Sequence, residues 1–354
     1  MNVLIYRLGS LGDFIVTIPA LRLIIEKHKN DRIVLLTNSR YDGKVVIAEE
    51  LFPKGIYYDD VIYYPLKLRN IIELMKLIIK LRKMRIDILY NLNPFDTRKQ
   101  NTLKYLFFKL AGIRKIYGLH WMKANKPVID SDGLYEKFGQ AVLRNIGFDA
   151  TISNINCRYC LGEENVVPNL GIEGKYFVFS AGSKAKIKMW DISNWQKLFN
   201  YLNQYSGEFT AVAIGAEEEY GINQKIIDKW LGKSINLSGK LSFKEIASLL
   251  KGAFFYIGID SGLMHLAASV GTKVFSIFSS QDIPGLWFPI GDHSIFYTDI
   301  ECKGCRLNEC KIGNNICINH ISPELVVKHL IRYLEYKDYS AGVVYVERNI
   351  IQKV

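Results

Sequence analysis

The chain has 354 residues, 49% of them hydrophobic, and a formal net charge of +11. This length exceeds one ordinary core and predicts two domains, and no stretch approaches the ~20 uninterrupted apolar residues of a membrane-spanning helix. Residues 1–165 hold 26 Lys and Arg against 17 Asp and Glu, whereas the remainder holds 20 against 18. The basic first part indicates an anionic partner, with a generic basic surface as the alternative.

The first part of the chain alternates apolar segments with helical patterns. Strands are predicted at 3–6, 33–36, 61–64 and 86–92, and helices at 14–29 and 68–85. This alternation is typical of parallel βαβ units in a doubly wound sheet. The run from Lys67 to Arg85 has seven basic residues and one acid, Glu73. It predicts either a helix that covers the sheet or one that lies on an anionic membrane surface.

The pattern restarts after a predicted linker at 156–174. Strands are predicted at 176–180, 209–214, 253–259 and 274–278, and helices at 193–205, 218–231 and 243–250. We therefore expect one domain at 1–165 and a second at 170–334, with residues 335–354 packing back on the first. Ligands of such sheets bind beyond the carboxyl ends of the strands, here expected in a cleft between the domains.

The stretch Gly258–Ala268 joins a buried strand directly to a helix. Asp260 and Ser261 are natural N-cap residues, and Gly262 permits a close approach of the backbone. The positive end of the helix would favour an anionic ligand. A capped turn alone also explains these residues, but His265, one turn into the helix, favours an anionic ligand.

This stretch resembles the Asp-Ser-Gly-x-x-His-Leu-Ala signature of the heptosyltransferase-like glycosyltransferases, family 9, typified by ADP-heptose:lipopolysaccharide heptosyltransferases. The resemblance implies the GT-B fold: two Rossmann-like doubly wound parallel-sheet domains facing a central cleft. It also implies that this stretch contacts the diphosphate of a nucleotide-sugar donor. We expect Asp260 to cap the helix and hold the loop, while Ser261, Gly262 and His265 face the phosphates.

The segment Arg7–Asp13 follows the first predicted strand, and its glycines allow a tight turn. Glycosyl transfer to a hydroxyl needs a base, and Asp13 could serve as one or could cap the helix from Phe14. The segment resembles the family's N-terminal Arg-x-x-x-x-Gly-Asp motif, whose Asp is taken as the catalytic base. The resemblance implies a base at Asp13 and an acceptor-side loop formed by Arg7, Gly9, Ser10 and Gly12.

Three lysines follow the small residues of the loop after 176–180: Lys184, Lys186 and Lys188. A lysine directed at the departing diphosphate would stabilise the transition state. Lys188-Met189-Trp190 resembles the family's Lys-x-Trp, which favours Lys188 over the other two. The family usually has a Pro and a Gly-Ala where this chain reads Ser180-Ala181-Gly182.

Three further donor contacts are expected in the second domain. Ser183 belongs to the same small-residue loop. Glu219 matches by spacing the acid of a family Gly-x-x-x-acid turn and would bind ribose hydroxyls, although three adjacent acids also fit a helix N-terminus. Leu241 resembles an apolar wall of the family's base pocket.

Four cysteines, Cys302, Cys305, Cys310 and Cys317, lie within sixteen residues. In a cytoplasmic protein this spacing indicates a structural zinc or iron site, with free thiols as the alternative. Four thiolates would leave no open coordination position, so no catalytic cofactor is expected. Cys157 and Cys160 form a further pair that is too isolated to assign.

The family resemblance implies an inverting, metal-independent glycosyltransferase that uses a nucleotide sugar, ADP-heptose first, and a lipopolysaccharide-core type or other glycan or protein acceptor. Arg7 and Asp13 interrupt the early apolar run, so no signal peptide is predicted. The expected location is cytoplasmic, with peripheral association at the inner membrane. The alternatives are an epimerase-like nucleotide-sugar enzyme and, less favoured, a nucleic-acid-binding protein.

Overall fold

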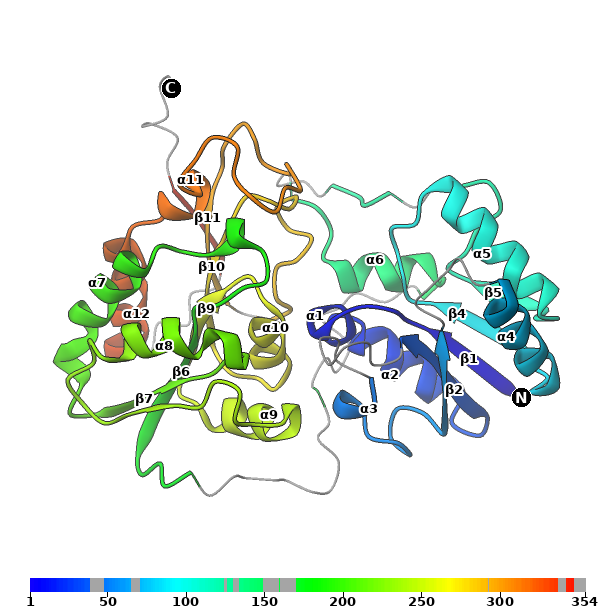
Figure 1. Ribbon diagram of the computed structural model, residues 1–354, viewed down its shortest axis with the longest axis horizontal. Helices are drawn as coiled ribbons and strands as arrows, with labels where there is room; N and C mark the ends of the chain where they lie inside the picture. Colours follow the sequence, from blue (N-terminus) through cyan, green and yellow to red (C-terminus); the bar gives the residue numbers. More distant parts are fainter. Residues whose placement is uncertain are drawn as a thin grey trace. The chain divides into compact units, whose positions relative to one another are not determined.

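The computed structural model describes residues 1–38, 48–64, 71–123, 126–129, 134–148, 159, 170–291, 293–336 and 342–346. It divides into two compact units, Met1–Glu164 and Asn165–Val354. Each unit is an α/β domain built on its own parallel sheet (Figure 1). Among the described helices, none has the length and apolar content needed to cross a bilayer.

The described part of the first domain contains a five-stranded sheet in the order β3-β2-β1-β4-β5, in which every pairing is parallel. Its strands are β1 Asn2–Tyr6, β2 Arg32–Asn38, β3 Asp60–Tyr64, β4 Ile88–Asn91 and β5 Lys115–Tyr117. Its helices are α1 Leu11–Ile15, α2 Ile18–Lys27, α3 Ala48–Leu51, α4 Ile71–Lys83, α5 Arg98–Leu110 and α6 Phe138–Asn145.

Helices cover both faces of this sheet. On one face, Leu4 of β1 packs in a core with Leu77 of α4 and Phe108 of α5. Because side chains alternate along a strand, Val3 and Ile5 of β1 face the other side, which α2 and α6 cover (Figure 1). The first domain is therefore doubly wound, as the sequence predicts.

Within its described residues the second domain has a seven-stranded parallel sheet in the order β12-β11-β10-β9-β6-β7-β8. Its strands are β6 Lys175–Ser180, β7 Phe209–Ala213, β8 Ser234–Asn236, β9 Tyr256–Ile259, β10 Val274–Phe278, β11 Ser294–Thr298 and β12 Gly342–Val346. Its α-helices are α7 Ile192–Leu202, α8 Tyr220–Ile227, α9 Phe243–Gly252, α10 Gly262–Ser269, α11 Ile316–Asn319 and α12 Pro323–Tyr336. Its 3₁₀ helices are η2 Lys186–Lys188, η3 Asn203–Tyr205 and η4 Glu217–Glu219.

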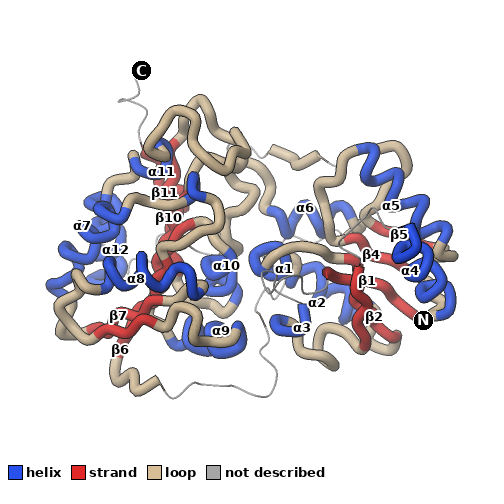
Figure 2. Tube along the Cα trace, viewed as in Figure 1, coloured by secondary structure: helices blue, strands red, loops and turns tan. Residues whose placement is uncertain are grey.

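The second sheet also lies between two helix layers. Phe177 and Phe179 of β6 pack with Trp195 of α7 and Leu330 of α12. The alternate residue Val178 faces the other side, where α9 and α10 contact each other (Figure 2). The predicted fold class, two Rossmann-like doubly wound parallel-sheet domains, is confirmed.

The C-terminal strand differs from our expectation. Residues 335–354 were expected against the first domain, but β12 pairs in parallel with β11 along Ser294–Thr298. Val344 and Val346 pack against the core of the second domain, because their apolar side chains extend the buried face of that sheet. Most of the predicted linker, 156–174, lies outside the described residues.

Truncation of a large side chain in the core of the second domain should destabilise that domain. Trp195 is fully buried, so Trp195→Ala should lower the free energy of unfolding of this domain by about 3–5 kcal/mol through lost contacts and a cavity. Leu231, 79% exposed in the same domain, is the control, and Leu231→Ala should stay within about 0.5 kcal/mol. Urea unfolding followed by circular dichroism measures both, and equal effects would contradict the assignment.

Candidate active site

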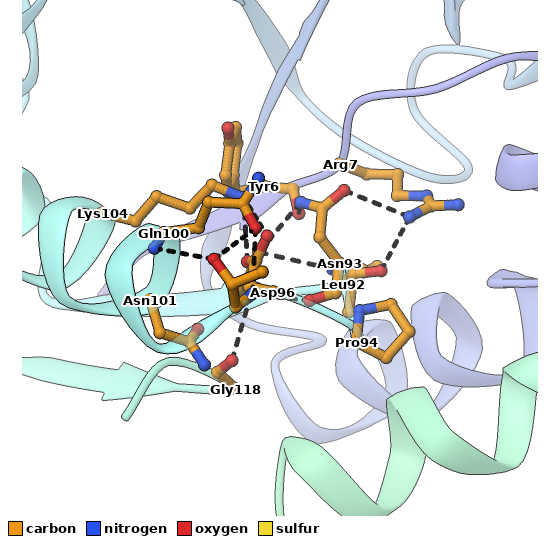
Figure 3. A network of polar contacts seen from close by, with 12 residues as sticks. Tyr6, Arg7, Leu92, Asn93, Pro94, Asp96, Gln100, Asn101, Lys104 and Gly118 are labelled. Atoms are coloured by element: carbon orange, nitrogen blue, oxygen red, sulfur yellow. Dashed lines mark hydrogen bonds and ion pairs between the residues drawn. The ribbon is translucent and has the colours of Figure 1, made fainter. Parts of the chain in front are cut away.

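Arg7 directly follows β1 and fixes the loop after it. Its Nε and Nη2 donate to the backbone oxygen of Asp13 at 3.0 and 2.6 Å. Nη1 donates to the Leu92 oxygen and to Asn93 Oδ1, each at 3.1 Å (Figure 3). Burial lowers the pKa of Arg7, while the Asp13 carboxylate opposes that shift. The buried guanidinium thus ties the loop after β1 to the loop after β4.

Asp13 has partners on both carboxylate oxygens. Oδ1 accepts from Arg7 Nη2 at 3.0 Å, and Oδ2 accepts from the backbone nitrogen and hydroxyl of Ser10, both at 2.8 Å. A Cβ on Gly9 would lie 2.4 Å from the Asp13 Cβ, so the loop needs glycine there. Asp13 sits in the first turn of α1 beside the buried Gly12, and its side chain is 29% exposed. The carboxylate therefore holds the start of the helix and still reaches solvent.

A second polar cluster of the first domain joins the end of β1, the loop after β4 and helix α5. Asp96 is buried and accepts two hydrogen bonds from Lys104 Nζ of α5, at 2.7 and 2.8 Å (Figure 3). The ammonium lies 5.5 Å from the centre of the Tyr6 ring. Burial and then Tyr64 raise the pKa of Tyr6 well above its ordinary value. The sequence reasoning missed this cluster, although Asp96 closely follows a predicted strand.

In the second domain, Lys188 is held between two carboxylates. Its Nζ lies 2.5 Å from Asp260 Oδ2 and 3.1 Å from Asp282 Oδ2. Lys188 comes from η2 after β6, Asp260 follows β9, and Asp282 lies in the loop after β10. These three strands are neighbours in the sheet, so their carboxyl ends meet.

The charge on Lys188 depends on both partners. Burial by itself would lower the pKa of Lys188, but Asp260 and then Asp282 raise it well above its ordinary value. Lys188 therefore stays an ammonium ion. We missed Asp282 from the sequence; the available signal was an acid four residues beyond the strand predicted at 274–278.

Two glycines make room for Glu219. A Cβ on Gly182 would lie 2.2 Å from the Glu219 carboxyl carbon, and one on Gly215 would lie 2.4 Å from its Oε2. The carboxylate accepts a hydrogen bond from the Ala216 backbone nitrogen at 2.9 Å. Burial raises the pKa of Glu219, and the bond from Ala216 lowers it. Glu219 thus lies over the loops that follow β6 and β7.

The start of α10 differs in one detail from our expectation. Ser261 is the N-cap, and its hydroxyl accepts from the Met264 backbone nitrogen at 3.4 Å. Asp260, expected to cap the helix, instead binds Lys188 because the lysine loop ends beside it. His265 is buried in α10, with its ring centre 6.1 Å from that of Trp287. Gly262 is the first residue of the helix.

The other expected donor residues lie on neighbouring loops of the same domain. Ser183 Oγ accepts from the Ala185 nitrogen at 3.2 Å. Leu241 is half-buried in the turn before α9, and the Gly239 nitrogen of this turn donates to the Gly215 oxygen. The turn is thereby tied to the loop after β7.

A shallow hollow of about 370 Å³ lies beside the lysine loop. Its lining residues are Lys184, Ala185, Lys186, Asn308 and Glu309. Lys186 pairs with Glu309 at 3.1 Å, and both are largely exposed. Lys184 acts on the Glu219 carboxyl by lowering its pKa. Two further lysines of the lysine loop thus line this hollow.

The four cysteines form no disulfide, and some of their thiols lie close enough to raise one another's pKa. Cys317 is buried and its Sγ accepts from the Ser280 nitrogen at 3.3 Å. Burial raises the pKa of the Cys302 and Cys317 thiols, which favours the protonated form. All four are free thiols, and among the described residues no three His, Cys, Asp or Glu side chains gather for an ion. Cys157 and Cys160 lie outside the described residues.

Comparison with known proteins gives consistent matches. The family described as glycosyltransferase family 9 (heptosyltransferase) matches residues 140–316. Lipopolysaccharide heptosyltransferase 3 of Escherichia coli strain K12 is 23% identical over 302 residues, which cover 77% of this chain and 80% of that protein. Lipopolysaccharide heptosyltransferase 1 of Salmonella typhimurium and a lipopolysaccharide heptosyltransferase 3 of Escherichia coli align over 55% and 43% of their own lengths.

Two solved structures share the fold over nearly the whole chain. A glycosyl transferase family 9 protein from Veillonella parvula has a TM-score of 0.68 at 17% identity, covering 94% of this chain and 97% of that one. The ADP-heptose lipopolysaccharide heptosyltransferase II of E. coli has a TM-score of 0.65 at 16% identity, covering 96% and 100%.

Removal of the Lys188 ammonium from its ion cluster should destabilise the second domain strongly. Lys188→Met leaves two carboxylates without their cation and should lower the free energy of unfolding of the second domain by about 2–4 kcal/mol, somewhat below a fully buried pair because Asp282 is part-exposed. Lys186→Met, which removes an exposed pair, should change it by less than about 1 kcal/mol. Urea unfolding measures both.

The pH dependence of that difference has a definite sign. The pKa of Lys188 is raised on folding, so its contribution is complete below its unfolded value of about 10.4 and declines only as pH rises through the higher folded value. The difference between the wild type and Lys188→Met should therefore stay constant from about pH 7 to 9. A fall within that range would show that the lysine is not held as described.

Proposed function

The chain belongs to glycosyltransferase family 9, and from that premise we propose that it transfers a heptose from ADP-heptose to an anionic acceptor of the lipopolysaccharide-core type. The observation that carries the proposal is the gathering of Lys188, Asp260 and the start of α10 at one edge of the second sheet. The similarity to an E. coli ADP-heptose enzyme supports the choice of donor.

The donor is proposed to bind the second domain. The backbone N–H groups at the start of α10, with Ser261, Gly262 and His265, would bind the diphosphate. Glu219 would accept hydrogen bonds from the ribose, and Leu241 would contact the base. Lys188 is already compensated by two carboxylates. Asp260 and Asp282 would accept hydrogen bonds from sugar hydroxyls, while Lys184, Lys186 and Ser183 of the loop after β6 would lie near the phosphates.

The proposed reaction is a single displacement that needs no metal ion. The acceptor oxygen forms a bond to the anomeric carbon while the bond from that carbon to the diphosphate oxygen breaks. The electron pair leaves with ADP, and the acceptor proton passes to Asp13. Attack opposite the leaving group inverts the anomeric configuration. Lys188 and the α10 N-terminus would stabilise the negative charge that grows on the leaving phosphate.

The acceptor is proposed to bind the first domain, where the excess positive charge lies. Arg7, Gly9, Ser10 and Gly12 shape the loop that presents Asp13. A glycolipid acceptor would place the enzyme in the cytoplasm at the inner-membrane surface. We assign the four cysteines no catalytic role, and a structural zinc or iron ion there stays a prediction from their spacing.

Ligand-induced stabilisation tests the donor. ADP-heptose at about 100 times its dissociation constant should add about 2.7 kcal/mol to the stability of the second domain. Thermal unfolding with ADP-heptose, ADP, UDP-glucose and GDP-mannose would identify the nucleotide and the sugar. Stabilisation by a uridine or guanosine sugar nucleotide, and none by ADP-heptose, would reject the proposed donor.

Asp13→Asn tests the base. The variant should release ADP about 100-fold more slowly in the presence of a lipopolysaccharide-core acceptor, because the amide cannot take the proton. Its stabilisation by ADP-heptose should equal that of the wild type. Asp60→Asn, which alters an exposed ion pair of the same domain, is the matched control and should keep full turnover.

The amide that Asp13→Asn introduces has one acceptor oxygen where the carboxylate has two, so the loop loses a hydrogen bond. The unfolding free energy of the variant should fall by about 1–2 kcal/mol, which circular dichroism would follow. Full turnover by a folded variant would remove Asp13 from the mechanism.

A further inference from the structure

Helix α4 has two apolar faces, and the core of the first domain accounts for only one. Leu77, Ile78 and Leu81 pack into that core. A second set of apolar side chains is exposed: Ile71 at 74%, Ile72 at 66%, Met75 at 53% and Ile79 at 49%. Positions 71, 75 and 79 recur every four residues and so lie on one face of the helix. This face is more apolar than a sheet-covering helix requires.

Helix α5 repeats the arrangement. Phe108 is its buried anchor, while Leu103, Leu106 and Leu110 are 57%, 41% and 58% exposed. Their spacing of three and four residues places them in one stripe. Two successive helices of the first domain thus direct aliphatic side chains away from its core.

The two helices are neighbours on the same face of the first sheet. Arg82 Nε of α4 donates to the backbone oxygen of Leu110 at the end of α5, at 2.9 Å. Figures 1 and 2 show α4 beside α5. Because both pack inward against one core, their opposite faces look outward together. We call the exposed aliphatic residues of the two helices together the α4–α5 surface: Ile71, Ile72, Met75, Ile79, Leu103, Leu106 and Leu110.

This surface is bordered by positive charge. The basic residues of the two helices, apart from the paired Lys104, are Lys76, Lys80, Arg82, Lys83, Arg98, Lys99 and Lys109. Glu73 is the only acid on either helix, and it pairs with Lys76. The long basic side chains can lay their methylene groups over apolar material and keep their charges at its edge.

Aliphatic side chains beside basic ones match the interface of an anionic bilayer, where the former enter the acyl boundary and the latter meet the headgroups. A second copy of the chain fits poorly, because a twofold interface would oppose two positive surfaces. Nucleic acid also fits poorly, since aliphatic residues offer no aromatic ring on which bases could stack.

We propose that the α4–α5 surface binds the anionic face of a lipid bilayer. The proposal deepens the proposed function, since a glycolipid acceptor is itself held in a membrane. Only the biological role of the binding rests on that function. The binding itself depends on the exposed aliphatic residues and on the lysines. Residues 65–70, which precede α4, lie outside the described residues, and the proposal does not include them.

Sedimentation of the full chain with vesicles tests the proposal. Wild type should bind vesicles with about 30% phosphatidylglycerol in phosphatidylethanolamine far better than pure phosphatidylcholine vesicles, and binding should weaken as salt rises. Ile71→Ser with Ile79→Ser should lower the partition coefficient about 10-fold or more. Lys76→Gln, Lys80→Gln and Lys83→Gln together should lower it on the order of 100-fold, since each lysine near an anionic leaflet contributes about fivefold.

Matched controls come from the second domain. Leu231→Ser with Ile312→Ser removes two exposed aliphatic residues, 79% and 54% exposed. Lys225→Gln, Lys229→Gln and Lys233→Gln remove the same charge from exposed positions. Both control proteins should sediment like wild type. Equal losses in the controls and in the surface variants would overturn the proposal, because general charge and hydropathy would then explain binding.

Three other outcomes would also reject it. Failure of the wild-type protein to sediment with anionic vesicles would show that it does not bind them. A concentration-dependent dimer that the Ile71→Ser and Ile79→Ser variant abolishes, without vesicle binding, would assign the surface to self-association. Lysine-dependent binding to a labelled DNA duplex without vesicle binding would assign it to nucleic acid. Thermal stabilisation by ADP-heptose, measured on each variant, tests the proposed function separately and should not change.

Discussion

Parallel pairing of the strands is the constraint on which the described structure depends. Every described pairing in both sheets is parallel, so the carboxyl ends of neighbouring strands meet at one edge, and the residues that follow them meet as well. The order β10-β9-β6-β7 brings the loops carrying Asp282, Asp260, Lys188 and Glu219 together in that sequence. Residues almost a hundred positions apart in the chain become neighbours because their strands are parallel and close together in the sheet.

Each domain then uses a cation to fix its loops, Arg7 buried and Lys188 partly buried. Arg7 joins the loop after β1 to the loop after β4 through backbone and side-chain acceptors. Lys188 joins three loops through two carboxylates. The planar guanidinium suits several acceptors in fixed directions, whereas the ammonium ion acts as a point charge between acids. The first site holds one carboxylate in place. The second is a cluster of one ammonium ion and two carboxylates, with a formal net charge of −1.

The sequence predicted four strands in each parallel sheet, because alternating apolar runs and helical patterns report local structure. It did not predict β5, β8, β11 or β12. It singled out Lys188 and Asp260 separately, yet their contact depends on strand order, which local patterns do not contain. Asp282 was missed for the same reason. The exposure of Ile71 and Leu103 was equally hidden, since a helical apolar pattern does not reveal which of two faces the core occupies. β12 was missed because Gly342–Val346 follows a long helix and has no motif beside it.

The crowding around Glu219 has an evolutionary consequence. One carboxylate fills the space that side chains at Gly182 and Gly215 would occupy, although the two glycines lie on different loops. A substitution at either glycine would displace Glu219 and leave the backbone largely in place. These three positions should therefore vary as a set among homologous chains: a larger residue at 182 or 215 should accompany a shorter or absent acid at 219.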